Sequence, residues 1–219
     1  MHPVTRSQAD SPRCLDVAIA LFEGFEVLDV FGPVELFSQV PDYFSMSFVA
    51  PEEGPVTSSQ RVQVIAEKAL DSSDNPDVLF IPGGKGTRTL VNDRVFLDHL
   101  HRLGSQAEHV LTVCTGSALA AAAGLLDGRD ATSNKLAFGW ATAQGPNVNW
   151  QSQARWVEDS KVWTSSGVAA GMDMAHAFVS HVAGNTVARD AANRVELEVH
   201  TDPSWDPFAQ LHGLGPRHA

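Results

Sequence analysis

A cysteine stands at the junction between a short apolar run and an alanine-rich segment, where Val110–Val113 is followed by Cys114, Thr115, Gly116 and Ser117. This order predicts a strand that turns sharply into a helix, which is the backbone shape of a nucleophile elbow. The unpaired N–H groups and the dipole at a helix N-terminus favour thiolate over thiol. Because the thiolate is the reactive form, Cys114 is a candidate nucleophile. The alternative is that Cys114 is a small buried side chain without reactivity, as most free cysteines are.

Two carboxylates, Glu26 and Asp29, follow the first apolar run of the chain, near the expected start of a helix. In an open parallel sheet the loops that follow the strands meet at one edge, and ligands bind there. A carboxyl group at this edge could move a proton to or from a nearby cysteine. An acid at a helix start also commonly caps the helix or interacts with its dipole.

Two loops rich in small residues follow other expected strands. One contains Gly83 and Gly84 after Pro82, and the other contains Gly167 within Ser165–Asp173. Glycines let backbone N–H groups approach a ligand closely, as an oxyanion hole requires. They are equally common in ordinary strand-to-helix connections, and the glycine and lysine spacing of a P-loop is absent.

Apolar runs alternate with helical patterns along the chain, which is typical of βαβ units around a parallel sheet. The sequence therefore predicts an α/β fold. Strands are expected at 17–22, 45–50, 77–81, 110–113, 154–157 and 162–165, with a hairpin or edge pair within 56–66. Helices are expected at 29–40, 94–106, 117–123, 134–143, 167–183 and 186–199. The tail from Thr201 is expected to pack loosely through Trp205 and Phe208.

The composition is that of a globular protein of 219 residues, 43% hydrophobic and 19% charged. We expect one domain over residues 14–219, preceded by a flexible tail over residues 1–13. A net charge of −11 argues against a nucleic-acid or membrane partner. The apolar runs are too short to cross a bilayer and the N-terminus lacks a signal-peptide pattern, so a cytoplasmic location is expected. The two cysteines are then expected to be reduced, with Cys14 in a structural role.

Four motifs occur in a characteristic order: Leu28-Asp29 with Gly32-Pro33, Ile81–Gly84, Val113–Ser117 with Ala123–Arg129, and Ser166-Gly167 with Ala170–Asp173. Together they resemble the ThiJ/PfpI superfamily over about Val17 to Phe208. Within it, the chain is most similar to the isonitrile hydratase-like branch and to the amidase-like sensor domains of AraC-type regulators. The resemblance implies a flavodoxin-like, doubly wound α/β fold with a mostly parallel sheet, assembled as a homodimer.

The resemblance also assigns roles to residues. It implies that Cys114 is the catalytic nucleophile and that Asp29 is the catalytic acid and base. The residues that it implies for oxyanion or substrate binding are Gly83, Gly84, Thr115, Gly116 and Gly167. One position departs from the pattern, because many relatives carry a histidine where this chain has Asn134. An amide cannot accept a proton at physiological pH, so a Cys–His–acid triad is unsupported while a Cys–Asp dyad is intact.

The reaction that suits this dyad is the hydration of a small-molecule isonitrile to an N-substituted formamide, through a thioimidate on Cys114. Such an enzyme is a lyase. Two alternatives stay open: a glyoxalase-like or amidase-like enzyme of the same superfamily, and a non-enzymatic domain that senses a ligand or redox state. No cofactor is expected. The histidines do not predict a metal site, since for example His99 and His101, two apart on an expected helix, face different directions.

Overall fold

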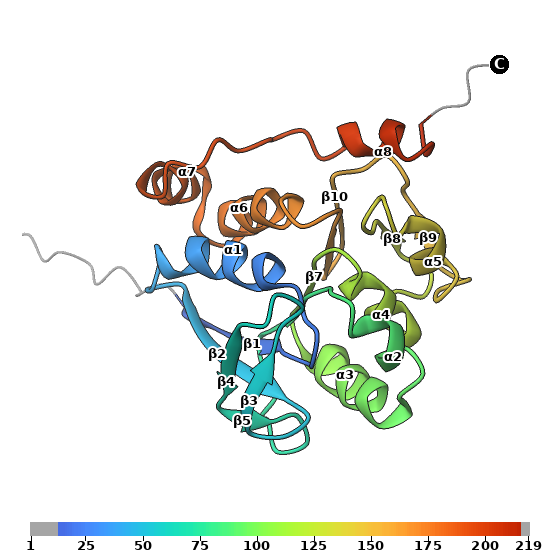
Figure 1. Cartoon of the computed structure of the whole chain (residues 1–219). Coiled ribbons are helices and arrows are strands. Elements are labelled where there is room, and N and C mark those ends of the chain that lie inside the picture. Colours follow the sequence, from blue (N-terminus) through green and yellow to red (C-terminus); the bar gives the residue numbers. More distant parts are fainter. Residues whose placement is uncertain (1–12, 216–219) are drawn as a thin grey trace, which may run out of the picture.

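A seven-stranded sheet forms the centre of the computed structural model, which describes residues 13–215 (Figure 1). The strand order is β10-β11-β7-β6-β1-β2-β5. Every neighbouring pair is parallel except β10 and β11, which are antiparallel. The predicted flexible tail lies outside the described residues, apart from Arg13. The predicted flavodoxin-like α/β fold with a mostly parallel sheet is confirmed.

The strands at the centre of this sheet are short, mostly apolar and buried on both faces, as parallel strands covered by helices usually are. The bounds of all the strands in the sheet are β1 Leu15–Ala20, β2 Phe44–Ala50, β5 Lys68–Ala69, β6 Val78–Ile81, β7 His109–Thr112, β10 Trp156–Asp159 and β11 Val162–Ser165. Two small two-stranded sheets accompany it, formed by β3 Gly54–Thr57 with β4 Gln63–Ala66, and by β8 Asp130–Ala131 with β9 Asn149–Trp150.

Helices cover both faces of the central sheet. In Figure 1, α1, α6 and α7 lie on one side, and α2, α3 and α4 lie on the other, with α5 beside α4. Their bounds are α1 Val27–Ser38, α2 Thr87–Leu90, α3 Arg94–Gln106, α4 Gly116–Ala122, α5 Phe138–Thr142, α6 Ala170–Ala183, α7 Asn185–Arg194 and α8 Pro207–Leu211. No helix among the described residues is long and apolar enough to span a membrane.

The structure corrects the predicted role of the C-terminal tail's aromatic residues. Trp205 and Phe208 are 56% and 52% exposed, whereas Asp206 and Ala209 are buried. The tail is therefore held by a buried carboxylate and by a small side chain on α8. The predicted helix at 134–143 is also wrong at its start, since α5 begins only at Phe138. The preceding residues instead form a loop, in which the Asn134 side chain accepts a hydrogen bond from the Ala137 N–H at 2.9 Å.

The site predicted from sequence lies at the carboxyl ends of the central strands, because β11, β7, β6 and β1 are neighbours in the sheet and run in the same direction. A loop follows the carboxyl end of each of these strands. The loops after β1 and β6 are joined by an antiparallel bridge between Phe25 and Gly84 and by a 2.8 Å hydrogen bond from the Glu26 N–H to the Gly83 carbonyl. This contact brings the start of α1 beside the loop that follows β6.

Candidate active site

Cys114 lies at a sharp turn, two residues after β7 ends and two residues before α4 begins. Its φ of 56° falls in the left-handed region that side chains other than glycine seldom adopt. The turn is fixed from outside, because the Cys114 N–H donates to the Ser166 carbonyl at 3.0 Å. The hydroxyls of Ser117 and Ser133 each donate to the Cys114 carbonyl at 3.1 Å. These bonds hold a strained backbone of the kind that is concentrated at functional sites.

The expectation of a thiolate at Cys114 is corrected by the structure. Burial raises the pKa of the Cys114 thiol, and the nearby negative charge of Asp29 raises it further. Hydrogen bonds from Thr115 and Asn134 lower this pKa, but by less. The thiol is only 7% exposed, and α4 has seven residues, so desolvation outweighs the attraction of the helix N-terminus. The resting side chain is therefore a neutral thiol that needs a base.

Asp29 is the base that the structure places next to this thiol. It sits in the first turn of α1, is fully buried, and lies close enough to the Cys114 thiol for each side chain to change the pKa of the other. Its Oδ2 accepts a 2.8 Å hydrogen bond from the Gly83 N–H. Its Oδ1 is buried with no hydrogen-bond partner among residues 13–215. Burial raises the pKa of Asp29 to about 7, so the carboxyl can carry or release a proton near neutral pH.

This raised pKa has a measurable effect on stability. Between about pH 4 and pH 7 the folded protein holds the Asp29 proton more tightly than the unfolded chain does, so stability falls as the pH rises through that window. We therefore expect the free energy of unfolding of Asp29→Asn, relative to that of the unsubstituted protein, to rise by up to about 4 kcal/mol as the pH is raised from about 4 to 8. Urea unfolding at both pH values measures this difference.

The matched control for that measurement is Asp98→Asn, which removes an exposed carboxyl group from α3. Its stability relative to the unsubstituted protein is expected to be the same at both pH values, because its carboxylate is already solvated. If Asp29→Asn gave no larger a pH-dependent gain than Asp98→Asn, the buried carboxyl would not titrate near neutrality.

The loop after β6 packs so tightly against Cys114 and Asp29 that its glycines are required. A Cβ at Gly83 would lie 2.6 Å from the Thr115 nitrogen, and Gly84 has a φ of 134°. The Gly83 N–H donates to Asp29, and the Gly84 N–H donates to the Thr115 Oγ1 at 3.1 Å. The N–H groups of Gly83 and Gly84, two of the residues predicted for oxyanion or substrate binding, therefore already have partners in the protein. The Thr115 N–H is near enough to the thiol to lower the pKa of Cys114.

The remaining predicted residues surround the same turn. Gly116 begins α4, and its N–H donates to the Val113 carbonyl at 2.9 Å. Gly167 lies against the Asn134 amide, since a Cβ there would be 3.2 Å from the Asn134 Nδ2. Asn134, at the position where many relatives carry histidine, lies near enough to the thiol to lower its pKa, but an amide cannot act as its base. The structure thus brings the candidate residues of all four loops together.

Sequence reasoning missed a cation beside this cluster. The Arg88 guanidinium lies over the Trp140 ring, 3.3 Å from its centroid. Arg88 follows Thr87, whose hydroxyl contacts the Thr115 Oγ1 at 3.2 Å. Partial burial lowers the pKa of Arg88, and the negative charge that Cys114 would carry when ionised acts in the opposite direction. An arginine after a glycine-rich loop carries no signal in the sequence that could have revealed this position.

Other titratable groups do not form a metal centre in the part of the chain that the structure describes, because no group of three His, Cys, Asp or Glu side chains is arranged to hold an ion. Cys14, predicted to be structural, is exposed, and its Sγ lies 3.8 Å from the Pro41 carbonyl oxygen. The two cysteines therefore occupy opposite environments, which makes Cys14 a useful reference for the chemistry of Cys114.

Comparisons with known proteins identify the family of the chain. The DJ-1/PfpI family model matches residues 16–181. The chain is 31% identical to an isonitrile hydratase of Pseudomonas putida over 194 residues, which is 89% of this chain and 81% of the relative. It is 25% identical to the HTH-type transcriptional regulator CdhR of Pseudomonas aeruginosa, covering 83% of this chain but only 55% of the regulator.

Among solved structures, a THiJ/PfpI family protein from Pseudomonas syringae superposes with a TM-score of 0.79 at 27% identity, covering 91% of this chain and 83% of that one. The match covers most of the chain. The family model, this structural match and the four ordered motifs agree with one another. The chain belongs to the DJ-1/PfpI family.

Proposed function

We propose that this protein hydrates isonitriles to N-substituted formamides. The observation that carries the proposal is the buried pair of Cys114 and Asp29, in which the unpartnered Asp29 Oδ1 is available to exchange a proton. The similarity to an isonitrile hydratase over most of both chains supports the choice of reaction. The pair needs no histidine, which suits a chain with Asn134 beside its cysteine.

The first step makes a thioimidate. The Asp29 carboxylate takes the thiol proton from Cys114, and the resulting thiolate attacks the isonitrile carbon. As the carbon–sulfur bond forms, one π bond of the isonitrile becomes a lone pair on nitrogen, and the carbon receives the proton back from Asp29. The raised pKa of both groups suits this exchange, because neither side chain holds its charge strongly in the buried site.

The second step releases the product. The Asp29 carboxylate deprotonates a water molecule as its oxygen adds to the thioimidate carbon, and Asp29 then passes that proton to the nitrogen. The carbon–sulfur bond breaks with its electrons on sulfur, and the hydroxyl proton returns through Asp29 to Cys114. One water molecule is consumed and one formamide is formed, so the pair regains its starting state.

Product analysis by mass spectrometry tests this reaction. The protein is incubated with an aromatic isonitrile in water enriched in heavy oxygen, and the expected product is the formamide with the label in its carbonyl. A parallel incubation with methylglyoxal tests the glyoxalase-like alternative, for which lactate would be the product. Lactate without any formamide would replace the proposal with that alternative, and unlabelled formamide would contradict the role of water.

A ligand-sensing role is the second candidate, because the chain is also similar to transcriptional regulators over much of its length. A redox-sensing role is less well supported. Oxidation is fastest at exposed thiolates, whereas Cys114 is buried and its pKa is raised. A sensor would bind an isonitrile or a related small molecule without releasing formamide, so the same incubation separates it from the hydratase.

A further inference from the structure

A cavity of about 240 Å³ lies beside the Cys114 turn and is not used by the two catalytic side chains. Asn134 and Ser166 are among the residues that line it, and both lie close to Cys114. The Asn134 side chain is near enough to the thiol to lower its pKa, and the Ser166 carbonyl accepts the Cys114 N–H. The end of the cavity at Asn134 and Ser166, called its inner end, therefore lies next to the turn that carries Cys114.

The inner end also holds a polar group that lacks a partner. The Ser166 hydroxyl is fully buried, lines the cavity, and forms no hydrogen bond with any residue from 13 to 215. A buried hydroxyl without a partner is costly unless a ligand or water satisfies it. Because the Ser166 side chain has no exposed surface, a ligand in the cavity would meet the partly exposed Asn134 side chain rather than this hydroxyl.

Most of the exposed surface that lines the cavity is apolar. Leu136, Val168, Ala169 and Phe208 contribute to it, and Leu136 is 78% and Phe208 52% exposed. The ionisable side chains that border the cavity are Lys135, Arg155, Asp206 and His212, of which the first three are buried. An apolar ligand that contacted the apolar side chains would remove their surface from water. An internal cavity of about 150 Å³ is large enough to hold benzene. The cavity here is therefore of a size to hold one aromatic ring or a branched alkyl group, but not a large fused system.

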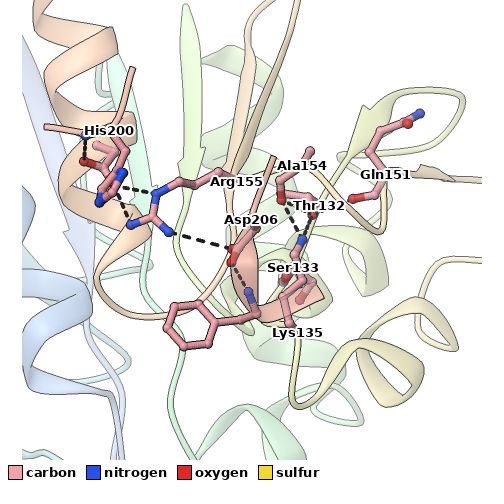
Figure 2. Close-up of polar contacts among 10 residues, drawn as sticks. Thr132, Ser133, Lys135, Gln151, Ala154, Arg155, His200 and Asp206 are labelled. Atoms are coloured by element: carbon pink, nitrogen blue, oxygen red, sulfur yellow. Dashed lines mark hydrogen bonds and ion pairs between the residues drawn. The ribbon is translucent and has the colours of Figure 1, made fainter. Parts of the chain in front are cut away.

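The C-terminal segment, residues 200–215, supplies Phe208 and is anchored by polar contacts inside the protein. The Arg155 N–H donates to the Pro203 carbonyl and the Asp206 N–H donates to the Gln153 carbonyl, each at 2.8 Å. The Asp206 carboxylate faces the Arg155 guanidinium at 3.9 Å, and Figure 2 shows these side chains pointing towards one another. Phe208 is thus held over the cavity by a fixed strap.

We propose that residues 200–215 form the outer wall of the substrate cavity, and that Phe208 selects isonitriles whose N-substituent is a single aromatic ring or a branched alkyl group. This inference rests on the proposed hydration reaction and names its substrate class. The segment lies outside residues 16–181, which the family model matches.

The test compares kcat/KM for phenyl isonitrile with that for methyl isonitrile. Phe208→Ala is expected to lower the phenyl-to-methyl ratio roughly tenfold, because the ring loses its apolar wall. Ala169→Phe, which fills the cavity, is expected to lower the ratio by at least as much. Trp205→Ala is the matched control, since Trp205 is an exposed aromatic residue of the same strap that does not line the cavity. A ratio that stays constant in both cavity variants would overturn the proposal.

A second measurement does not depend on hydration. In a Cys14→Ser background, Cys114 is alkylated by iodoacetamide or by its N-phenyl derivative, the sulfur displacing iodide in each case. The quantity measured is the alkylation rate with the N-phenyl reagent divided by the rate with iodoacetamide. If the cavity holds the ring, this ratio is higher for Cys114 than for a free thiol in solution, and Ala169→Phe lowers it to the free-thiol value. Preference without formamide formation would support the cavity and contradict the hydratase. Equal relative rates in the protein and in the free thiol would contradict the cavity itself.

Discussion

Cys114→Ala is expected to lower formamide formation by roughly a thousandfold or more, since removal of a nucleophile that acts together with its base eliminates most of the chemical step. The substitution removes one sulfur atom from a well-packed turn, and the backbone bonds to Ser166, Ser117 and Ser133 do not depend on the thiol. Formamide released per minute, followed by liquid chromatography with mass detection, is the measurement.

Cys14→Ser provides the reference for this loss, because it removes the exposed cysteine and is expected to leave turnover within twofold or so of the unsubstituted protein. Circular dichroism shows whether the Cys114→Ala chain is folded. Residual turnover within tenfold of the unsubstituted protein, in a folded variant, would exclude a covalent intermediate on Cys114.

The covalent step itself can be seen in Asp29→Asn. An amide cannot take the proton from water, so this substitution is expected to slow hydrolysis of the thioimidate. At alkaline pH some Cys114 thiolate forms without a base, so formation of the thioimidate is expected to slow less than its hydrolysis. Intact-protein mass spectrometry would then show an adduct with the mass of one whole isonitrile. Digestion should locate it on Cys114, and an adduct on Cys14 alone would argue against the assignment.

Arg155→Met is expected to cause the largest loss of stability, about 3–5 kcal/mol, because it leaves buried carboxylates without their cation. Arg155 is 7% exposed, and its guanidinium lies 2.6 Å from the Asp173 Oδ2 and 3.9 Å from the Asp206 Oδ2. These contacts join α6 to the strap formed by residues 200–215. Urea unfolding of the two proteins at the same pH measures the loss, and limited proteolysis reports release of the strap.

Two controls separate this network from a general effect of removing an arginine. Arg189→Met breaks an exposed pair with Asp190, whose contribution is expected to be below about 1 kcal/mol. The triple variant Arg155→Met, Asp173→Asn, Asp206→Asn removes the stranded charges and is expected to recover part of the stability. If Arg189→Met were as damaging as Arg155→Met, the buried network would not be what anchors the strap.

Local sequence patterns located most of the fold. The helix predicted at 94–106 coincides with α3, whose Phe96, Leu100 and Leu103 are buried as their helical spacing requires. The helix predicted to extend from Thr186 to Val199 instead ends at Arg194. The short strands β5, β8 and β9 were not predicted, because two residues contain no period and gain their order only from the strand beside them.

The sequence by itself determined the parallel sheet, the turn that carries Cys114 and the position of Asp29 at the start of a helix, since each depends on residues that are close together in the chain. Only the tertiary structure decided the protonation chemistry of that pair. The high pKa of Cys114 and of Asp29 arises first from burial under distant segments, and the charge of Asp29 raises the pKa of Cys114 further. Neither effect can be read from local spacing. The same holds for the strap over the cavity, because the contact between Arg155 and Asp206 joins residues whose pairing depends on how the whole chain packs.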